Sequence, residues 1–572
     1  MSSNKIPPAW LKAAGCWALL SLPVLLKVSA DTPVIVVTPA RYAQPIEQVG
    51  SSVVRLEGEE LRQRGIQFVE DALREVPSLI VSSQGARGSQ VQLRARGNEA
   101  NHVLVLIDGI RVGNASSGEF DLSGLGLSAV DNIEVLLGPQ STLYGSDAIG
   151  GVVNITTIKG EVGYSGRIGL ERGERGIQSL QASVRGASQR WHYALSLDDF
   201  EDQGISSAAE ANGNVEQDPY AKQSVYFRSG YQSEYYAASL LGGSSRADLD
   251  FDGTDTLTGL ATDEALNQQH SEQDHLSLLI EIPTHEQRMQ NQLQISRIDN
   301  DLDSISADFG EFATATERVT AEYRGSIRIN QGNSLQFGLQ HIDEKLTTES
   351  ISSFFTSVFA ADYEQSGLYL NWLHQYQQLN LSLGARVGDH DGFGRHDDYR
   401  LTASYQHSPV IRYRAAWGTA YKVPSLQELY GGFGGNPELE PEQSESAEIG
   451  IEYQQDSYQL TATYFDQQTT NLIRFQPITK FSGINKNVGK AESQLRMGLG
   501  NLFAVAEQYP ELKANESFQH LQARISTLEE SIADRRLQDD ARFVHRALGD
   551  RGARSVMVSW GYRSFAGTGG LG

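Results

Sequence analysis

The fold of this chain is decided by the stretch Tyr144-Gly145-Ser146-Asp147-Ala148-Ile149-Gly150-Gly151-Val152-Val153-Asn154-Ile155. Gly145, Gly150 and Gly151 permit tight backbone turns and the close approach of a neighbouring chain. The β-branched run from Val152 onward predicts entry into a strand. The stretch contains no nucleophile–base pair and no phosphate-binding loop pattern. We therefore interpret it as a packing element of a folded domain.

The surrounding region, residues 31–159, has the pattern of a compact α+β unit that can bury a core of its own. A helical pattern opens at residues 56–61 and continues with apolar residues at helix-like spacing until Pro77 ends it. The dipeptide Asp108-Gly109 is a strong hairpin signal. Short strands are predicted at residues 91–93, 103–107, 133–137 and 152–155.

Residues 160–493 have a different texture, in which segments of about ten residues alternate in polarity. Leu379, Leu381 and Leu383 share one face of such a segment, while Asn380 and Ser382 share the other. This alternation is typical of transmembrane barrel strands, which are apolar toward lipid and polar toward the lumen. A soluble β-sandwich also alternates, but many strands in one series with aromatic residues near their ends favour the barrel. Similar runs occur at residues 224–231, 235–241, 368–376 and 458–464.

Long polar inserts interrupt this series at residues 201–220, 246–273 and 355–365. Outer-membrane barrels place short turns on the periplasmic side and long loops outside, so we expect these inserts to be external loops. After the N-terminus, no segment offers 18 consecutive apolar residues. If the chain spans a membrane, it does so as a β-barrel, the other fold that satisfies its backbone in lipid.

The N-terminus has the pattern of a secretory signal peptide. Lys5 and Lys12 precede a low-polarity run over residues 13–26, and Val28-Ser29-Ala30 supplies a small-residue cleavage site after Ala30. The run is shorter than the roughly 20 residues of a membrane-spanning helix. Cys16, the only cysteine, could end a lipoprotein box, but the stronger apolar stretch follows it, which favours a plain signal peptide. The mature chain is then expected to hold no disulfide.

Several motifs give the chain a specific resemblance. The opening stretch, with Leu104-Val105-Leu106-Ile107-Asp108-Gly109 and Gly138-Pro139, resembles the plug domain of TonB-dependent receptors, most of all the cobalamin receptors. Residues 393–396, 421–430 and 435–442 resemble signatures of the barrels of the same receptors. The resemblance covers residues 31–493. It implies an α+β plug (residues 31–159) inside a transmembrane antiparallel β-barrel (residues 160–493) of the 22-stranded type, located in the bacterial outer membrane.

The start of the predicted mature chain resembles a TonB box, the segment that pairs with TonB as an added strand. A β-branched, extended and solvent-exposed strand is an open template for such pairing. The resemblance therefore implies that TonB, part of an inner-membrane energy-transducing complex, binds Asp31, Thr32, Pro33, Val34, Ile35, Val36, Val37 and Thr38.

The resemblance also implies active import of a scarce nutrient, bound outside on the outward loops of the plug around residues 83–88 and 113–120. Cobalamin is the leading substrate, and a ferric siderophore is the alternative within the same class. The candidate substrate-binding residues are Ser83, Gln84, Arg87, Asn114, Ser116 and Ser117.

The long inserts contain an acidic pattern. Asp248-Leu249-Asp250-Phe251-Asp252-Gly253 spaces three carboxylates at alternate positions before Gly, but position 12 is Gly259 and not the Glu of an EF-hand. Cobalamin receptors order external loops with calcium, so the resemblance implies a calcium site in this insert and in the acidic insert before it. The alternative is a solvated acidic loop. The candidate ligands are Asp198, Asp218, Asp248, Asp250 and Asp252.

The chain also departs from the family pattern. Leu137 stands where family plugs commonly carry Arg before Gly138-Pro139, which predicts the loss of a salt bridge between plug and barrel wall. Residues 160–493 provide about 15 residues per strand if 22 strands are present. Long loops use many of these residues, so the region is short for 22 strands. The chain ends at Gly572 and not at the aromatic residue of family barrels. We therefore expect an incomplete barrel that lacks its last strands.

The tail, residues 494–572, is interpreted as foreign or fused. Alternation stops near Leu495, and residues 502–536 follow an amphipathic helical pattern that Pro510 interrupts. Residues 502–518 resemble part of the LemA family of helical-bundle proteins. A join of unrelated fragments and an evolved fusion both account for the tail. Alternating residues near its end can form one strand, namely Val556, Val558, Trp560 and Tyr562.

Charge and motif content argue against two other classes of function, nucleic-acid binding and catalysis. A formal net charge of −24 argues against nucleic acid as a partner, since phosphate binding needs clustered Lys and Arg. The 12 His residues are scattered, with no His-Glu-x-x-His, no Gly-x-Ser-x-Gly and no phosphate loop, so we do not expect an enzyme. A truncated or fused product that folds only as plug and partial barrel, without transport activity, is the third hypothesis.

Overall fold

The computed structural model describes most of the region that resembles plug and barrel. The predictions for residues 1–30, for Asp31, Thr32 and Pro33, and for the helical part of the tail lie outside the described residues. The described residues are 34–206, 217–254, 261–262, 267–284, 288–306, 310–351, 356–455, 458–479, 482–493 and 556–561.

The plug is built on a five-stranded sheet in the order β3-β8-β9-β6-β7. β9 pairs antiparallel with β8 and parallel with β6, and every residue of β6 is buried. Ile107 opposes Ile110 across the predicted Asp108-Gly109 hairpin, which is confirmed. The strands are β3 (Val53–Glu57), β6 (Val103–Ile107), β7 (Ile110–Arg111), β8 (Val130–Leu137) and β9 (Gly151–Thr157).

The glycines of the opening stretch adopt the backbone states expected of them. Gly145 follows the short helix α3 (Ser141–Tyr144) with φ +79°. Gly151 has φ +155°, and a Cβ there would lie 2.4 Å from the carbonyl oxygen of Leu136 on the neighbouring strand. A side chain at Gly151 would push the paired strands apart, and a Cβ at Gly145 would lie 3.0 Å from Arg386. The interpretation as a packing element is confirmed.

The helical pattern predicted from residue 56 is only partly right. Leu56 lies in β3, opposite Ile133, and two short helices follow it, α1 (Gly58–Gln63) and α2 (Val69–Arg74). A single helix does not form because Gly65, at φ +79°, turns the chain between them. Leu61, Val69, Ala72 and Leu73 nevertheless lie in the plug core, as their helix-like spacing predicts.

Smaller elements complete the plug. β4 (Leu79–Ser83) and β5 (Val91–Ala95) form a separate hairpin. β1 (Ile35–Val36) pairs with β2 (Gln44–Pro45), and two 3-10 turns follow at η1 (Ile46–Gln48) and η2 (Ala100–His102).

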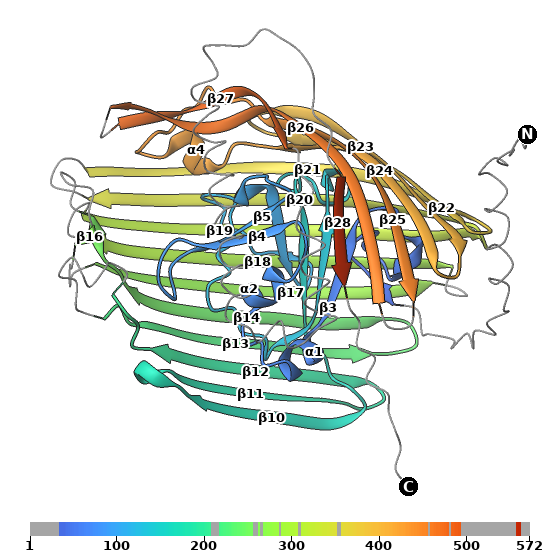
Figure 1. Cartoon of the computed structure of the whole chain (residues 1–572), viewed down its shortest axis with the longest axis horizontal. Helices are drawn as coiled ribbons and strands as arrows, with labels where there is room; N and C mark the ends of the chain where they lie inside the picture. Colours follow the sequence, from blue (N-terminus) through green and yellow to red (C-terminus); the bar gives the residue numbers. More distant parts are fainter. Residues whose placement is uncertain are drawn as a thin grey trace, which may run out of the picture. The chain divides into compact units, whose positions relative to one another are not determined.

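Beyond the plug, the described residues form one 17-stranded sheet whose neighbours are all antiparallel (Figure 1). Its strands are β10 (Gly163–Arg172), β11 (Gln178–Ala187), β12 (Trp191–Asp202), β13 (Tyr220–Gln232), β14 (Ala237–Asp250), β17 (Gln268–Thr284), β18 (Met289–Ser306), β19 (Gly310–Asn330), β20 (Asn333–Ile351), β21 (Thr356–Tyr376), β22 (Leu379–His390), β23 (Gly394–Ser408), β24 (Ile411–Lys422), β25 (Glu442–Gln455), β26 (Tyr458–Thr479), β27 (Ser482–Ser493) and β28 (Val556–Gly561).

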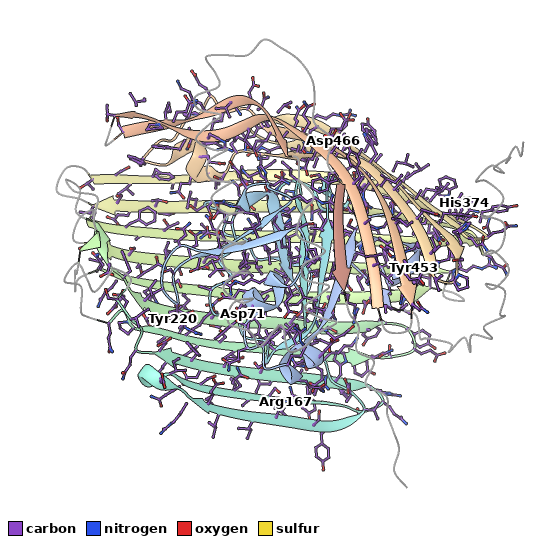
Figure 2. All side chains as sticks on the ribbon, in the orientation of Figure 1. Asp71, Arg167, Tyr220, His374, Tyr453 and Asp466 are labelled. Carbon is purple, nitrogen blue, oxygen red and sulfur yellow. The ribbon has the colours of Figure 1, made fainter. Side chains whose placement is uncertain are left out.

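Side chains project from both faces of this sheet (Figure 2), and the two faces differ in polarity as predicted. In β12, Tyr193 and Leu195 are exposed, while Ala194 and Ser196 between them are buried. The buried face carries the polar groups that meet the plug, and the exposed face carries the large apolar residues. No helix in the described part of the chain is long and apolar enough to cross a membrane.

One predicted loop is wrong. Residues 356–365 belong to β21, which pairs with β20 from Ile351↔Thr356 onward, so the polar insert continues the hairpin and does not leave the sheet. The reason is that inward and outward positions still alternate there, with Tyr363 buried and Val358 exposed. The other two inserts also begin within strands β12 and β14, and the second contains the short pair β15 (Gly253–Thr254) and β16 (Ala261–Thr262).

The sheet has two separate edges, in keeping with an incomplete barrel. Within the described residues, β10 pairs as a strand only with β11, and β27 and β28 both pair with β26 at the other edge. Gln467 opposes Ser493, and Tyr464 opposes Val556. A three-residue step along β26 thus corresponds to a 63-residue step along the chain. β27 and β28 together form one composite edge strand, which confirms the strand predicted near Val556.

Candidate functional site

The segment that resembles a TonB box lies against the plug where the structure describes it. Val37 and Thr38 donate their backbone N–H groups to the carboxylate of Glu134, at 3.0 and 2.8 Å. Arg55 donates to the carbonyl oxygen of Ile35 at 2.6 Å and to Glu134 at 3.3 Å. The expectation of a solvent-exposed strand is wrong for Val36 and Thr38, which are buried, because Glu134 satisfies the backbone at this place.

Arg41 ties the end of this segment to the large sheet. Its guanidinium forms two bonds of 2.5 Å with the two carboxylate oxygens of Glu322 in β19, and both side chains are buried. Burial alone lowers the pKa of Arg41, but Glu322 outweighs it and raises the pKa above its ordinary value. Tyr144 lies under the guanidinium and donates its hydroxyl to the carbonyl oxygen of Thr38 at 2.8 Å. The segment is therefore tied to both plug and sheet.

A second buried ion pair anchors the body of the plug. Nη2 of Arg96 lies 2.5 Å from Oε2 of Glu448 in β25, and Arg414 contacts the same carboxylate at 3.2 Å. A Cβ at Gly138 would lie 3.2 Å from Arg96 and 3.9 Å from Glu448. Arg96 therefore supplies a plug-to-sheet salt bridge next to Leu137. Leu137 removes a salt-bridging partner at its own position, and the plug keeps an anchor beside it through Arg96.

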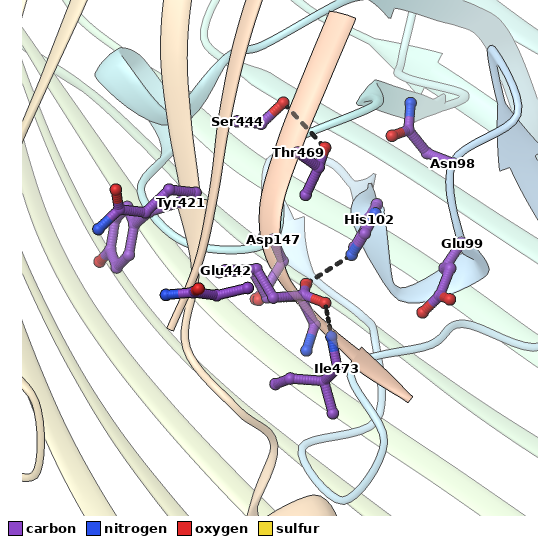
Figure 3. A network of polar contacts seen from close by, with 12 residues as sticks. Asn98, Glu99, His102, Asp147, Tyr421, Glu442, Ser444, Thr469 and Ile473 are labelled. Atoms are coloured by element: carbon purple, nitrogen blue, oxygen red, sulfur yellow. Dashed lines mark hydrogen bonds and ion pairs between the residues drawn. The ribbon is translucent and has the colours of Figure 1, made fainter. Parts of the chain in front are cut away.

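A third polar contact joins the turn η2 to the start of β25 (Figure 3). Nε2 of His102 lies 2.6 Å from Oε2 of Glu442, and the other oxygen of Glu442 accepts the backbone N–H of Ile473 at 2.7 Å. Burial alone lowers the pKa of His102, but the adjacent Glu442 raises it above its usual value. Glu99 lies close by on the plug, and burial raises the pKa of its carboxyl.

The first predicted substrate loop is the turn of the β4–β5 hairpin. Ser83, Gln84 and Arg87 are exposed on it. Arg87 is engaged with the sheet: it forms an ion pair of 3.1 Å with Asp202 and lies 5.2 Å from the ring centroid of Phe200. Ser83 and Gln84 are thus the more accessible members of this group.

The second predicted loop is held in place from two sides. Asn114 accepts the backbone N–H of Ser116 at 2.8 Å, and Ser117 accepts that of Glu119 at 3.2 Å. Ser116 is buried and donates its hydroxyl to Gln427 at 2.7 Å. Gln427 belongs to α4 (Leu426–Tyr430), inside one of the barrel signatures. The structure therefore places this loop beneath α4.

Family comparison agrees with this architecture. A model described as TonB dependent receptor-like, beta-barrel, matches residues 163–494, and a model of the TonB-dependent Receptor Plug Domain matches residues 45–152. The chain belongs to the TonB-dependent receptors. It is an outer-membrane receptor of a family of transporters, which works with TonB, and the alternation of its strands is that of a membrane-spanning sheet.

Relatives of this receptor include curated vitamin B12 transporters. The protein "Vitamin B12 transporter BtuB" of Photobacterium profundum is 25% identical over 520 residues, which cover 90% of this chain and 82% of the relative. A protein of the same name from Vibrio vulnificus is 25% identical over 448 residues, covering 77% and 70% of the two chains.

Solved structures share the fold of the receptor. A mutant of the ferric enterobactin receptor PfeA from Pseudomonas aeruginosa, in complex with enterobactin, superposes with a TM-score of 0.64 at 18% identity, over 77% of each chain. The siderophore receptor PirA from Acinetobacter baumannii superposes with a TM-score of 0.64 at 18% identity, over 77% of this chain and 76% of the other. A LemA family model also matches, over residues 470–541.

Among the described residues, the predicted calcium ligands do not form a group of three within ligand distance of one another, although Asp218 and Asp248 lie near enough to Asp250 to interact with its charge. Asp198 lies on the inner face of β12, where the plug residue Ser128 donates its hydroxyl to the Asp198 carboxylate. Asp248 pairs with His270 at 2.7 Å, and Asp252 accepts the hydroxyl of Ser206 at 3.2 Å. Asp218 is buried just before β13, and Asp250 is half-buried at the end of β14. The calcium site stays a prediction.

The sequence analysis missed the buried charges that hold the plug. Glu442 and Glu448 in β25 and Glu322 in β19 all face inward, and Glu134 lies within the plug sheet. A signal was present, because residues 442–452 alternate and place three of their four carboxylates at even positions, with apolar Ile449 and Ile451 on the opposite face. A charged side chain on the lumen-facing side of a strand indicates a contact with the plug inside the sheet.

Proposed function

We propose that this receptor imports cobalamin across the outer membrane with energy delivered through TonB. The observation that carries the proposal is the match to a vitamin B12 transporter over 90% of this chain and 82% of the relative. The match includes plug and sheet together, so it extends beyond the general fold. The motifs of residues 421–442 add support, because they hold the α4 segment over the second substrate loop.

Energy coupling is proposed to act on the segment Asp31 to Thr38. TonB pairs with this segment as an added strand, and that pairing competes with the bonds that Glu134 makes to Val37 and Thr38. Arg41 lies just beyond the segment and is bonded to Glu322 of the sheet, so a pull on the segment acts on this contact between plug and sheet.

Substrate contacts are proposed at Ser83 and Gln84, with Asn114 and Ser117 on the second loop. Calcium is proposed to order the acidic inserts, because carboxylate oxygens are ligands that Ca²⁺ prefers. Arg87 and Ser116 are proposed to hold the two loops in place. Arg87 links its loop to the sheet, and Ser116 links its loop to α4.

A ferric siderophore is the second candidate substrate. It is favoured by the fold shared with PfeA and PirA, at 18% identity. The cobalamin proposal ranks first because the sequence matches to vitamin B12 transporters are at 25% identity, and the first of them covers more of the chain.

The test is binding of radiolabelled cobalamin to outer membranes that contain the receptor, with and without calcium, and with ferric enterobactin as competitor. Saturable binding that calcium strengthens and enterobactin does not displace supports the proposal. Displacement by enterobactin favours the siderophore. No binding by a protein that is present in the heat-modifiable membrane fraction contradicts a cobalamin receptor. Absence from that fraction identifies a non-functional product whose open sheet does not assemble.

A further inference from the structure

The contact between η2 and β25 contains a set of metal-ligating groups that neither the transport proposal nor the predicted calcium loops use. Glu99 and His102 come from the plug, and Glu442 comes from the wall (Figure 3). One ligand atom of each residue lies within 4.8 Å of the other two. Among the described residues this is the only such group of three His, Cys, Asp or Glu side chains.

We propose that Glu99, His102 and Glu442 form a site for a divalent transition metal ion, with Zn²⁺ as the best fit, that clamps the plug to the wall. One imidazole nitrogen and two carboxylate oxygens are ligands that Zn²⁺ takes. Ca²⁺ and Mg²⁺ prefer oxygen ligands alone, so the imidazole discriminates against them. The site is therefore chemically distinct from the predicted calcium loops.

The geometry needs little change to accept the ion. In tetrahedral coordination, zinc ligands at about 2.0–2.2 Å from the metal lie about 3.3–3.6 Å from one another. The 4.8 Å envelope of the three groups is wider, so Glu99, the partly exposed member, must rotate toward the other two to complete the site. Nε2 of His102 and Oε2 of Glu442 already face each other at 2.6 Å, and the ion would separate them by replacing the hydrogen bond.

Surrounding groups orient the ligands. The backbone N–H of Ile473 holds Oε1 of Glu442 at 2.7 Å, which leaves Oε2 directed at His102, as supporting bonds do in metal sites. The nearby cation Lys422 is engaged by Glu428 at 3.2 Å. Arg474 contacts Glu99 at 3.5 Å, and the ion would take its place as the partner of that carboxylate.

The consequence of such a site is mechanical. Because two ligands belong to the plug and one to β25, the ion is held fully only while the plug stays against this strand. Bound Zn²⁺ stabilises the plugged state by mass action, and movement of η2 away from β25 removes the ion's third ligand. The inference concerns plug retention, so it holds for either substrate of the proposed function.

The experiment is a titration of the purified full receptor in detergent with Zn²⁺, in competition with a chromophoric chelator and without any cobalamin. We expect saturable binding of one Zn²⁺ per chain that excess Ca²⁺ does not displace. Glu99→Gln is the informative variant, because it removes one ligand and leaves the His102–Glu442 contact in place. It should weaken Zn²⁺ binding at least about tenfold, and His102→Gln should abolish it.

His374→Gln is the matched control, since His374 bonds Asn333 at 2.9 Å at a distant hairpin and lies outside the cluster. It should bind Zn²⁺ as the parent does. Thermal unfolding of the metal-free Glu99→Gln protein should match the parent, which separates ligand loss from misfolding. No stoichiometric binding, or equal affinity in parent and Glu99→Gln, overturns the proposal and leaves His102–Glu442 as a structural contact only. Neither result depends on whether the receptor binds cobalamin.

Discussion

Arg96 of the plug and Glu448 of β25 form a 2.5 Å ion pair in which the two side chains are 0% and 4% exposed. Arg414 shares the carboxylate at 3.2 Å. Arg414 also pairs with Glu452 at 2.8 Å, so Arg96 is the cation that relies on Glu448. The pair links residues far apart in the sequence, and it lies beside Gly138, whose Cβ would be 3.2 Å from Arg96.

Glu448→Gln should loosen the plug strongly. The substitution leaves Arg96 buried without its countercharge, whereas Arg414 keeps Glu452 at 2.8 Å. Removal of one partner from a buried pair costs about 3–5 kcal/mol. The measurement is resistance of the plug to limited proteolysis along a urea series. Glu272→Gln, which breaks the exposed pair with Arg246, is the control and should leave the profile unchanged. Equal resistance of parent and Glu448→Gln would show that the pair does not hold the plug.

Glu134→Gln should release the TonB-binding segment. Oε2 of Glu134 accepts the N–H groups of Val37 and Thr38, while Oε1 accepts from Val37 and from Arg55. An amide keeps one acceptor oxygen and no charge, so the bonds at the other oxygen are lost. Each lost hydrogen bond costs about 0.5–1.5 kcal/mol, so the undocked population should rise several-fold. A spin label at Val34→Cys reports this as faster motion. Glu57→Gln, which changes only the exposed partner of Arg55, should leave the label's mobility as in the parent.

Much of the fold follows from local pattern, whereas the site does not. The alternation around Leu379 predicts β22 and its two faces, and Asp108-Gly109 predicts its hairpin, because both signals are short-range. The break at Gly65 and the strand at residues 356–365 were mispredicted, since a helical spacing and a polar loop composition each fit more than one backbone path. The pairs Arg41–Glu322 and Arg96–Glu448 each join a turn of the plug to a strand far away in the sequence, and no local periodicity encodes which partners meet.

Gly151→Ala should disrupt the plug sheet more than an ordinary glycine substitution does. Gly151 has φ +155°, and the added Cβ would meet the Leu136 carbonyl at 2.4 Å, so β8 and β9 must move apart. Gly65→Ala is the control, because Gly65 has φ +79° but nothing within 4 Å of its Cβ. The control should cost about 1 kcal/mol of conformational energy, and Gly151→Ala should cost more. Urea unfolding of the two variants compares them directly. Equal midpoints would mean that the strands tolerate the Cβ.

The register of the last strand makes a sharper prediction about the tail. Ser493 opposes Gln467, and Val556 opposes Tyr464, three residues further along β26. A continuous strand would need a step of three residues between Ser493 and Val556, but the chain has 63, which is an excess of 60 residues. Deletion of residues 494–553 should therefore join β27 to β28 in register along β26. We expect this variant to enter the outer membrane and to keep the heat-modifiable band and protease resistance of the parent.

Deletion of residues 494–552 is the matched control. It leaves one residue too many, and a one-residue slip exchanges the inward and outward positions along β28. The shorter deletion should therefore lose protease resistance at the β26 edge, while the deletion of residues 494–553 retains it. If both deletions behave alike, β28 does not continue β27, and the segment from residue 494 onward is not an insertion into the edge strand.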